Sequence, residues 1–120
     1  MIEVMKGLPD NVVGLSAKEE VTGNDYDTVL IPLVSEKIKK HGKVRMLYQL
    51  GPDFAGYDAA AIWDDTMFGM SHMFDFEKVA VVSDVEWIRN ATRFFGVLLP
   101  CPVKTFDNKD LAAAKTWIIA

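Results

Sequence analysis

One nearly continuous apolar run, residues 43–50, constrains the fold of this chain more than any other feature. Basic residues at positions 37, 39, 40 and 41 precede the run, and Gly51-Pro52 follows it. Cations favour the last turn of a helix and a Gly-Pro pair ends a strand, so the segment predicts a helix end, a buried strand and a turn. A strand that is apolar on both faces is typical of a parallel sheet, which commonly binds ligands at its carboxyl edge.

Strand and helix patterns alternate along the rest of the 120 residues. Period-two alternation and short apolar runs predict strands at 2–6, 12–17, 44–50, 78–82 and 103–106, with a hairpin between the first two. Helical spacing of apolar residues predicts helices at 22–41, 57–72, 87–98 and from about 108 to 118. The order ββαβαβαβα predicts a single α/β domain: a mixed, mostly parallel five-stranded sheet flanked by four helices.

Local signals also predict how these elements begin and bend. Pro32 lies inside the first helix, where it removes a backbone hydrogen bond, and it predicts a kink. Thr22 or Asn24 is expected to cap the start of that helix. Ser83 and Glu86 match a capping box, which predicts a helix start at Ser83. The stretch 51–58 is expected to be a strand-to-helix turn.

Composition argues against several classes of function. The formal charge is −4 and the pI is near 5.1, which disfavours nucleic-acid binding because phosphate neutralisation needs a basic face. No apolar run reaches the roughly 18 residues that a membrane span needs, and the N-terminus lacks the pattern of a signal peptide. Cys101 is the only cysteine, so no internal disulfide can form. A cytoplasmic location is expected.

Methionine and aromatic residues are concentrated in and around the second predicted helix. Methionine side chains are flexible and adapt to irregular apolar partners. Phe68 and Met70 do not share one narrow stripe with Trp63 and Met67, so the helix is apolar over a wide arc. Three interpretations remain open: burial in the core on most sides, a contact between subunits, or a groove for an apolar ligand. The residues concerned are Trp63, Met67, Phe68, Met70, Met73, Phe74 and Phe76.

No motif specifies catalysis, a cofactor or a bound metal. Asp64 and Asp65 diverge by about 100° on a helix, so a solvated face is expected for them. His41 and His72 are the only histidines and lack the spacing of metal ligands. Cys101 has no evident activating base and is expected to be inert. No nucleophile, base and orienting group occur together, so the chain is expected not to be an enzyme, and no cofactor is predicted.

Five short segments carry a family pattern: Thr22–Tyr26, Leu30–Leu33, His41–Leu47, Lys78–Asp84 with Trp87, and Ala112–Trp117. In these segments the chain resembles the SpoIIAA-like family, whose domains belong to the STAS-type and CRAL-TRIO-like fold group. The resemblance implies the fold predicted above and two precedents for function. STAS-type anti-sigma-factor antagonists bind a kinase and are switched by phosphorylation of a serine after the third strand. The matching residues 51–58 contain no Ser or Thr, so that switch is not carried over. CRAL-TRIO domains hold an apolar molecule in a hydrophobic pocket.

The leading prediction is a non-enzymatic protein that binds a small apolar or lipid-like molecule. Its expected lining is Trp63, Met67, Met70, Phe74, Phe94 and Phe95, with Tyr26 as a polar gate. The alternative is a STAS-type interaction module that contacts a regulatory protein through Arg89 and Arg93, one turn apart on the third helix. A homo-oligomer is also expected, because the apolar arc of the second helix exceeds what one sheet face buries.

Overall fold

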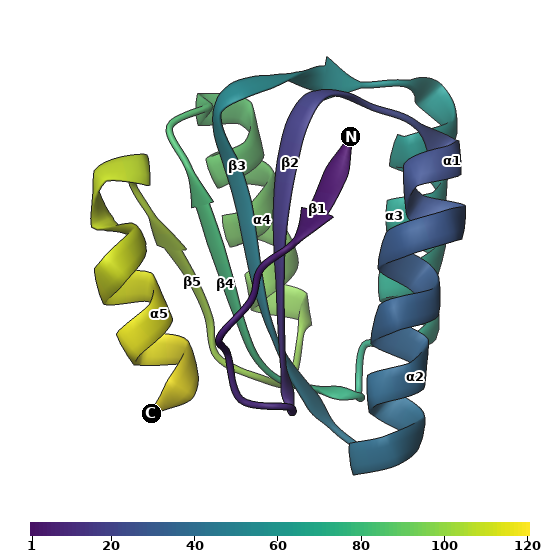
Figure 1. Cartoon of the computed structure of the whole chain (residues 1–120), viewed down its shortest axis with the longest axis vertical. Helices are drawn as coiled ribbons and strands as arrows, with labels where there is room; N and C mark the ends of the chain where they lie inside the picture. The colour runs from purple at the N-terminus through teal and green to yellow at the C-terminus, as the bar shows by residue number, and fades with distance from the viewer.

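The strands form one sheet in the order in which they occur along the chain. The computed structural model describes residues 1–120. β1 pairs antiparallel with β2, whereas β2, β3, β4 and β5 are parallel neighbours. The predicted mixed, mostly parallel five-stranded sheet is therefore confirmed (Figure 1). The strands are β1 (Ile2–Val4), β2 (Val12–Val21), β3 (Val44–Tyr57), β4 (Phe76–Ser83) and β5 (Val103–Phe106).

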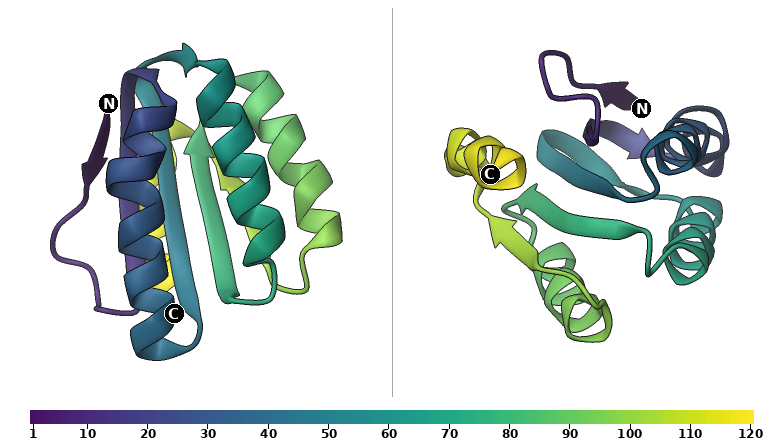
Figure 2. Two further views of the ribbon diagram at one scale, coloured as in Figure 1. Left: turned by 90° about the vertical axis from the view of Figure 1, so that its right-hand side faces the viewer. Right: turned by 90° about the horizontal axis from the view of Figure 1, so that it is seen from below.

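Four helical segments flank the sheet, as predicted. The first is a continuous helix made of α1 (Gly23–Asp25), the π turn η1 (Tyr26–Leu30) and α2 (Ile31–His41). Right-handed crossovers that all advance in one direction across the sheet place α2, α3 and α4 on the same face. α5 follows the last strand and covers the opposite face (Figure 2). The remaining segments are α3 (Ala59–Ser71), α4 (Glu86–Leu98), the 3-10 turn η2 (Asn108–Asp110) and α5 (Leu111–Ile119).

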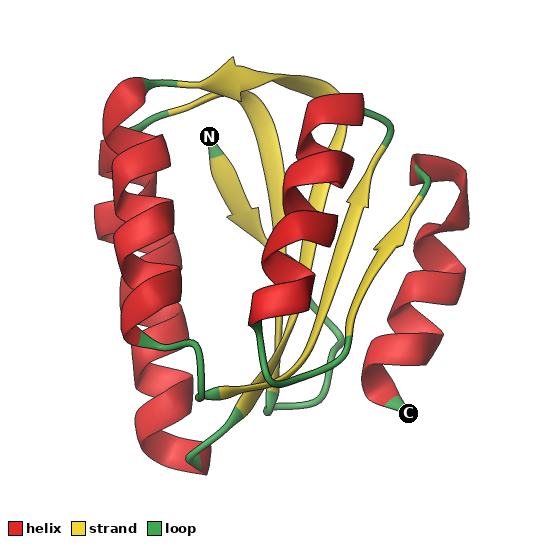
Figure 3. Cartoon of the chain, turned by 180° about the vertical axis from the view of Figure 1, so that it is seen from behind, coloured by secondary structure: helices red, strands yellow, loops and turns green.

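The sheet separates two hydrophobic cores. The larger core includes Leu15, Val34 and Leu50, which lie between the sheet and the first helical segment and are almost inaccessible to water. The smaller core lies beneath α5, where Leu47 and Ile118 are fully buried. Seen from behind, α4 lies in front of the sheet and apart from α2 and α3 (Figure 3).

Pro32 is accommodated by a π turn rather than by the simple kink that the sequence predicted. The N–H of Ile31 donates to the carbonyl oxygen of Tyr26, five residues earlier, and closes the wide turn of η1. The turn places Pro32 in the first turn of α2, where a proline's missing N–H costs little. Such π turns occur frequently at functional sites. Here the turn begins at Tyr26, whose ring enters the core.

β3 is twice as long as the predicted strand, so the prediction of a turn over 51–58 is wrong. The extension pairs with the end of β2, and Glu19, Glu20 and Val21 face Phe54, Gly56 and Tyr57. The pairing supplies backbone hydrogen bonds that the local sequence could not reveal, and a bulge in β2 near Glu19 bends the two strands together. The end of β3 arches over the sheet toward α3 (Figure 1).

The helix starts differ in part from the predicted caps. Thr22 caps α1 with a capping box: its Oγ1 accepts from the N–H of Asp25 at 3.2 Å, and its own N–H donates to the Asp25 carboxylate at 2.8 Å. The prediction of a capping box at Ser83 is wrong, because Ser83 is still part of β4 and is fully buried. α4 begins later, at Glu86, and its N-cap Val85 provides no side-chain hydrogen bond.

Candidate functional site

The position of α3 creates an open space over the sheet. The backbone of α3 approaches α1 and η1 closely, but not the sheet or α4. Asp58 caps α3 and also accepts a hydrogen bond from the N–H of Gly23 at 3.1 Å, which ties the two helix starts together. A Cβ added at Gly23 would lie 2.6 Å from the Cβ of Ala60, so glycine is required for this approach. α3 is therefore held at its beginning by another helix.

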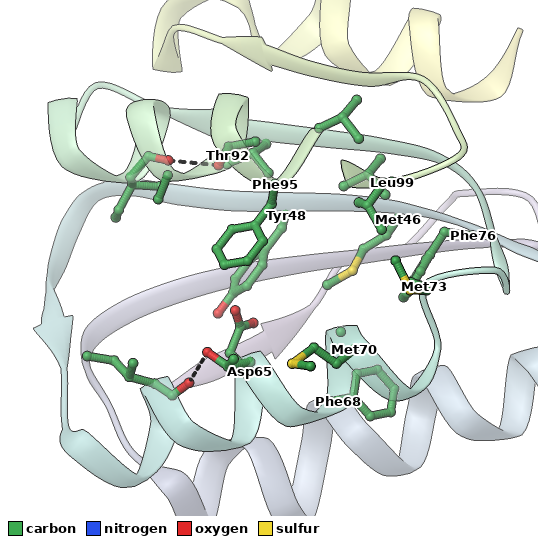
Figure 4. Close-up of a pocket in the computed structure, with 18 of the residues that line it drawn as sticks. Met46, Tyr48, Asp65, Phe68, Met70, Met73, Phe76, Thr92, Phe95 and Leu99 are labelled. Carbon is green, nitrogen blue, oxygen red and sulfur yellow. Dashed lines mark hydrogen bonds between the residues drawn. The ribbon is translucent and has the colours of Figure 1, made fainter. Parts of the chain in front are cut away.

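A cavity of about 580 Å³ lies between α3, α4 and the sheet. Hydrophobic residues make up 19 of the 23 that line it, and the volume lies in the range of small-molecule sites. Its floor is formed by β3 and β4, including Met46, Tyr48 and Val81. Figure 4 shows the side chains from both helices that converge on it. The wall residues from the helices include Ile62, Asp65, Thr66, Phe68, Gly69, Met70, Ile88, Ala91, Thr92 and Phe95.

The cavity opens to solvent through an apolar rim. Several large hydrophobic residues that line it are at the same time 46–67% exposed. Water in contact with this rim is unfavourable by about 25 cal/mol per Å² of apolar surface. An apolar molecule in the groove would therefore be stabilised by removing rim surface from water. The rim residues are Ile62, Met70, Trp87, Phe95 and Leu98.

Asp65 is the one ionisable carboxyl group in the lining, and a chain of tyrosine hydroxyls leads to it. The Tyr26 hydroxyl donates to Asp65 Oδ1 at 2.8 Å. Tyr48 lies 3.2 Å from the Tyr26 hydroxyl, and the Tyr57 hydroxyl donates to Tyr48 at 3.2 Å. Each hydroxyl has a single proton to donate. Because Tyr26 gives its proton to Asp65, the direction of donation is Tyr57 to Tyr48 to Tyr26 to Asp65.

Burial sets the pKa values of the tyrosine hydroxyls and the carboxyl group in this hydrogen-bonded row. Burial raises the pKa of Tyr48 to about 12, and it raises the pKa values of Tyr26 and Tyr57 as well. All three hydroxyls therefore stay protonated near neutral pH. Asp65 is in contact with water through the open groove. The apolar side chains around it raise its pKa, and the hydrogen bond from Tyr26 opposes that shift. No salt bridge involves Asp65.

The structure brings only part of the predicted lining together. Met70 and Phe95 line the cavity. Tyr26 is fully buried behind Asp65, so it is a support for that carboxylate and not a gate at the entrance. The other four predicted residues are exposed and lie outside the cavity: Trp63, Met67, Phe74 and Phe94.

Asp65 is the residue that the sequence interpretation missed: its side chain is exposed, as predicted, but it faces the open cavity and not the outer surface of the domain. It faces the cavity together with Ile62 and Gly69, which precede and follow it at helical spacing. A carboxylate within an apolar helix is a usable signal only when the orientation of that helix is known. The apolar arc of α3 is so wide that its sequence did not define the orientation.

The predicted partner-binding arginines do not form a common free face. Arg89 pairs with the Asp107 carboxylate, and Arg93 is exposed and donates to Asn90 at 3.4 Å. Burial raises the pKa of the Cys101 thiol, which keeps it protonated and poorly nucleophilic. No group of three or more His, Cys, Asp or Glu side chains is arranged to hold a metal ion. None of the helices is both long and apolar enough to span a lipid bilayer.

The fold and the site define a small α/β domain with an open, mostly apolar cavity beside a parallel sheet. A sequence model of the SpoIIAA-like family matches residues 12–119, so this chain belongs to the SpoIIAA-like family. A crystal structure of an uncharacterized DUF3478-family protein with a SpoIIAA-like fold, from Shewanella loihica PV-4, is also similar. It shares 25% identity over 98% of this chain and 92% of that chain, with a TM-score of 0.74. No curated protein matches this chain.

Proposed function

We propose that this protein is a non-enzymatic binding protein that holds a small apolar or lipid-like molecule between α3 and α4. The observation that carries the proposal is the cavity of about 580 Å³, which is lined mainly by hydrophobic residues. Three methionines, Met46 of β3, Met70 of α3 and Met73 of the turn after α3, contribute to its walls and can adapt to the shape of a ligand.

The chemistry of the lining supports binding rather than catalysis. General acid-base catalysis needs a group whose pKa lies near the working pH and a partner that orients it. Asp65, with its raised pKa and its hydrogen bond from Tyr26, is one such group, but the tyrosines beside it are poor acids and bases because burial raises their pKa values. No Cys, Lys, Arg or His lines the cavity, and the Thr66 and Thr92 hydroxyls donate to the carbonyl oxygens of Ile62 and Ile88.

Cavity filling tests this proposal directly. Gly69 lines the cavity, and a Cβ added there meets no atom within 4 Å. Gly69→Ala and Gly69→Leu both gain helix propensity, by about 1 kcal/mol relative to glycine, but only leucine extends an isobutyl group into the cavity. We expect a melting-temperature increase with octanol for the wild type and Gly69→Ala, and a much smaller one for Gly69→Leu.

Native mass spectrometry after gentle purification provides an independent measurement. The expected result is a co-purified small molecule or added mass on incubation with octanol. A clean mass of the chain alone, together with no thermal shift from octanol or from fatty acids, would count against a binding function. If octanol raised the melting temperatures of Gly69→Leu and Gly69→Ala equally, the ligand would have to bind outside this cavity.

A second candidate function is self-association through the outer face of α3. Trp63 and Met67 lie there one helical turn apart, and Phe74 follows in the turn after α3; they are outside the cavity and 66, 45 and 68% exposed. A second copy that covered this face would bury apolar surface that a lone chain leaves in water. Sedimentation velocity should then show a dimer for the wild type and a monomer for Trp63→Ser. A wild-type monomer at high concentration would contradict this second proposal.

A further inference from the structure

We propose, on the basis of the binding function above, that the ligand is an amphiphile whose polar end is a protonated amine, and that this amine pairs with the Asp65 carboxylate. The inference concerns the class of ligand. It follows from three features of the cavity: the hydrogen-bonding capacity that its polar groups still have, the charge that they leave without a partner, and the place where they gather.

The lining can accept hydrogen bonds but has little left to donate. The protons of Tyr57, Tyr48 and Tyr26 are used along the chain that ends at Asp65. The Thr66 and Thr92 hydroxyls donate to backbone carbonyl oxygens at 2.9 and 2.7 Å. The indole N–H of Trp87, at the exposed rim, is the side-chain donor of the lining that has no protein partner. A ligand head that only accepts, such as a carboxylate, would find few donors here.

Asp65 leaves a negative charge in the groove without a cation to balance it. No Lys, Arg or His is among the lining residues, and the only hydrogen bond to the Asp65 carboxylate comes from Tyr26. Asp65 Oδ2 is therefore free for a ligand. Figure 4 shows the carboxylate directed from α3 into the cavity toward Tyr48. In these apolar surroundings an ammonium group would be attracted to it, and an anionic head would be repelled.

The polar groups gather at one end of the cavity, which orients an amphiphile. Tyr57 precedes α3 in the chain and Asp65 is at the middle of α3, beside Tyr48, whereas Met73 and Leu99 lie toward the end of that helix (Figure 4). The distance along α3 from Asp65 to the last helical residue, Ser71, is about 9 Å. A ligand with one polar end and a medium-length alkyl chain or a small ring system would match this arrangement.

Three probes with the same alkyl chain separate this inference from the binding function itself. Octylamine, octanol and octanoate share their apolar part and differ only in the head group. Isothermal titration to the wild-type protein at neutral pH should give octylamine the tightest binding and octanoate the weakest, with at least about a tenfold difference between those two in dissociation constant. This comparison needs no variant.

Asp65→Asn then tests the role assigned to the carboxylate. The amide keeps an acceptor for Tyr26 and adds an N–H donor toward the ligand. We expect the preference for octylamine over octanoate to fall about tenfold or more, with octanol binding changed little. Octanoate binding as tightly as octylamine to the wild type would overturn the inference and leave the binding function intact. An unchanged amine preference in Asp65→Asn would also overturn it, and binding of none of the three probes would reject the proposed function.

Discussion

Replacing Tyr26 with phenylalanine tests the direction of the tyrosine chain. The substitution keeps the ring in the core and removes one hydroxyl, which donates to Asp65 and accepts from Tyr48. Water can reach Asp65 through the groove and replace the lost donor. The Tyr48 hydroxyl, however, belongs to a residue that is only 6% exposed, and its proton would lose its acceptor. An orphaned buried donor together with a lost charge-assisted hydrogen bond predicts a loss of about 2–3 kcal/mol in the free energy of unfolding.

Tyr57→Phe is the matched control. It removes the same atom from the other end of the chain, where the Tyr57 hydroxyl only donates. Tyr48 then loses a bond that it accepts and no buried proton is orphaned, so the expected loss is about 0.5–1.5 kcal/mol. Urea unfolding followed by tryptophan fluorescence measures both values, and Tyr26→Phe should lower the midpoint by about 1 M. Equal losses in the two variants, or a larger loss in Tyr57→Phe, would refute the assigned direction.

Two further predictions concern the packing of α3 against α1 and the protonation of Asp65. Gly23→Ala should lower the free energy of unfolding by about 1–3 kcal/mol, because the new Cβ would lie 2.6 Å from the Cβ of Ala60. Gly51→Ala is the control: its Cβ would meet only atoms 3.6 Å or more away, so it should be nearly neutral. Calorimetric melting curves compare the two variants, and equal melting temperatures would contradict the proposed close approach. Apolar surroundings raise the pKa of Asp65, so the folded state binds its proton more tightly than the unfolded state. Protonated Asp65 therefore adds to the free energy of unfolding below pH 4, about its pKa in the unfolded state. That contribution is lost as the pH rises through the pKa of Asp65 in the folded state. Asp65→Asn should lose less stability than the wild type between pH 4 and pH 7 in denaturant titrations, and parallel pH profiles would rule out this assignment.

The order of the elements and the class of the sheet could be predicted because their signals are local. Apolar runs such as 44–50 and 78–82 are dictated by burial on both faces of a parallel sheet. The cap at Thr22 also followed from residues within one turn. The extension of β3 to Tyr57 could not be predicted in this way, because it depends on pairing with the end of β2, which lies far away in the sequence.

The candidate site was predicted only in outline. The excess of methionine and aromatic residues drew attention to the second and third helices, which border the cavity, and Met70 and Phe95 line it. The expected lining of α3 was nevertheless placed largely on its outer side, at Trp63 and Met67. A shift of one or two residues along a helix turns a side chain by about 100–200°, so a small error in orientation exchanges cavity and solvent.

The amino-acid sequence by itself determined the succession of strands and helices, because backbone propensity and apolar periodicity act over a few residues. Only the tertiary structure decided that Tyr26, Tyr48, Tyr57 and Asp65 meet. These residues come from a π turn, a strand, its paired extension and a helix that stands off the sheet. Their meeting depends on how far and at what rotation α3 is held by α1, and that is a property of packing between distant segments.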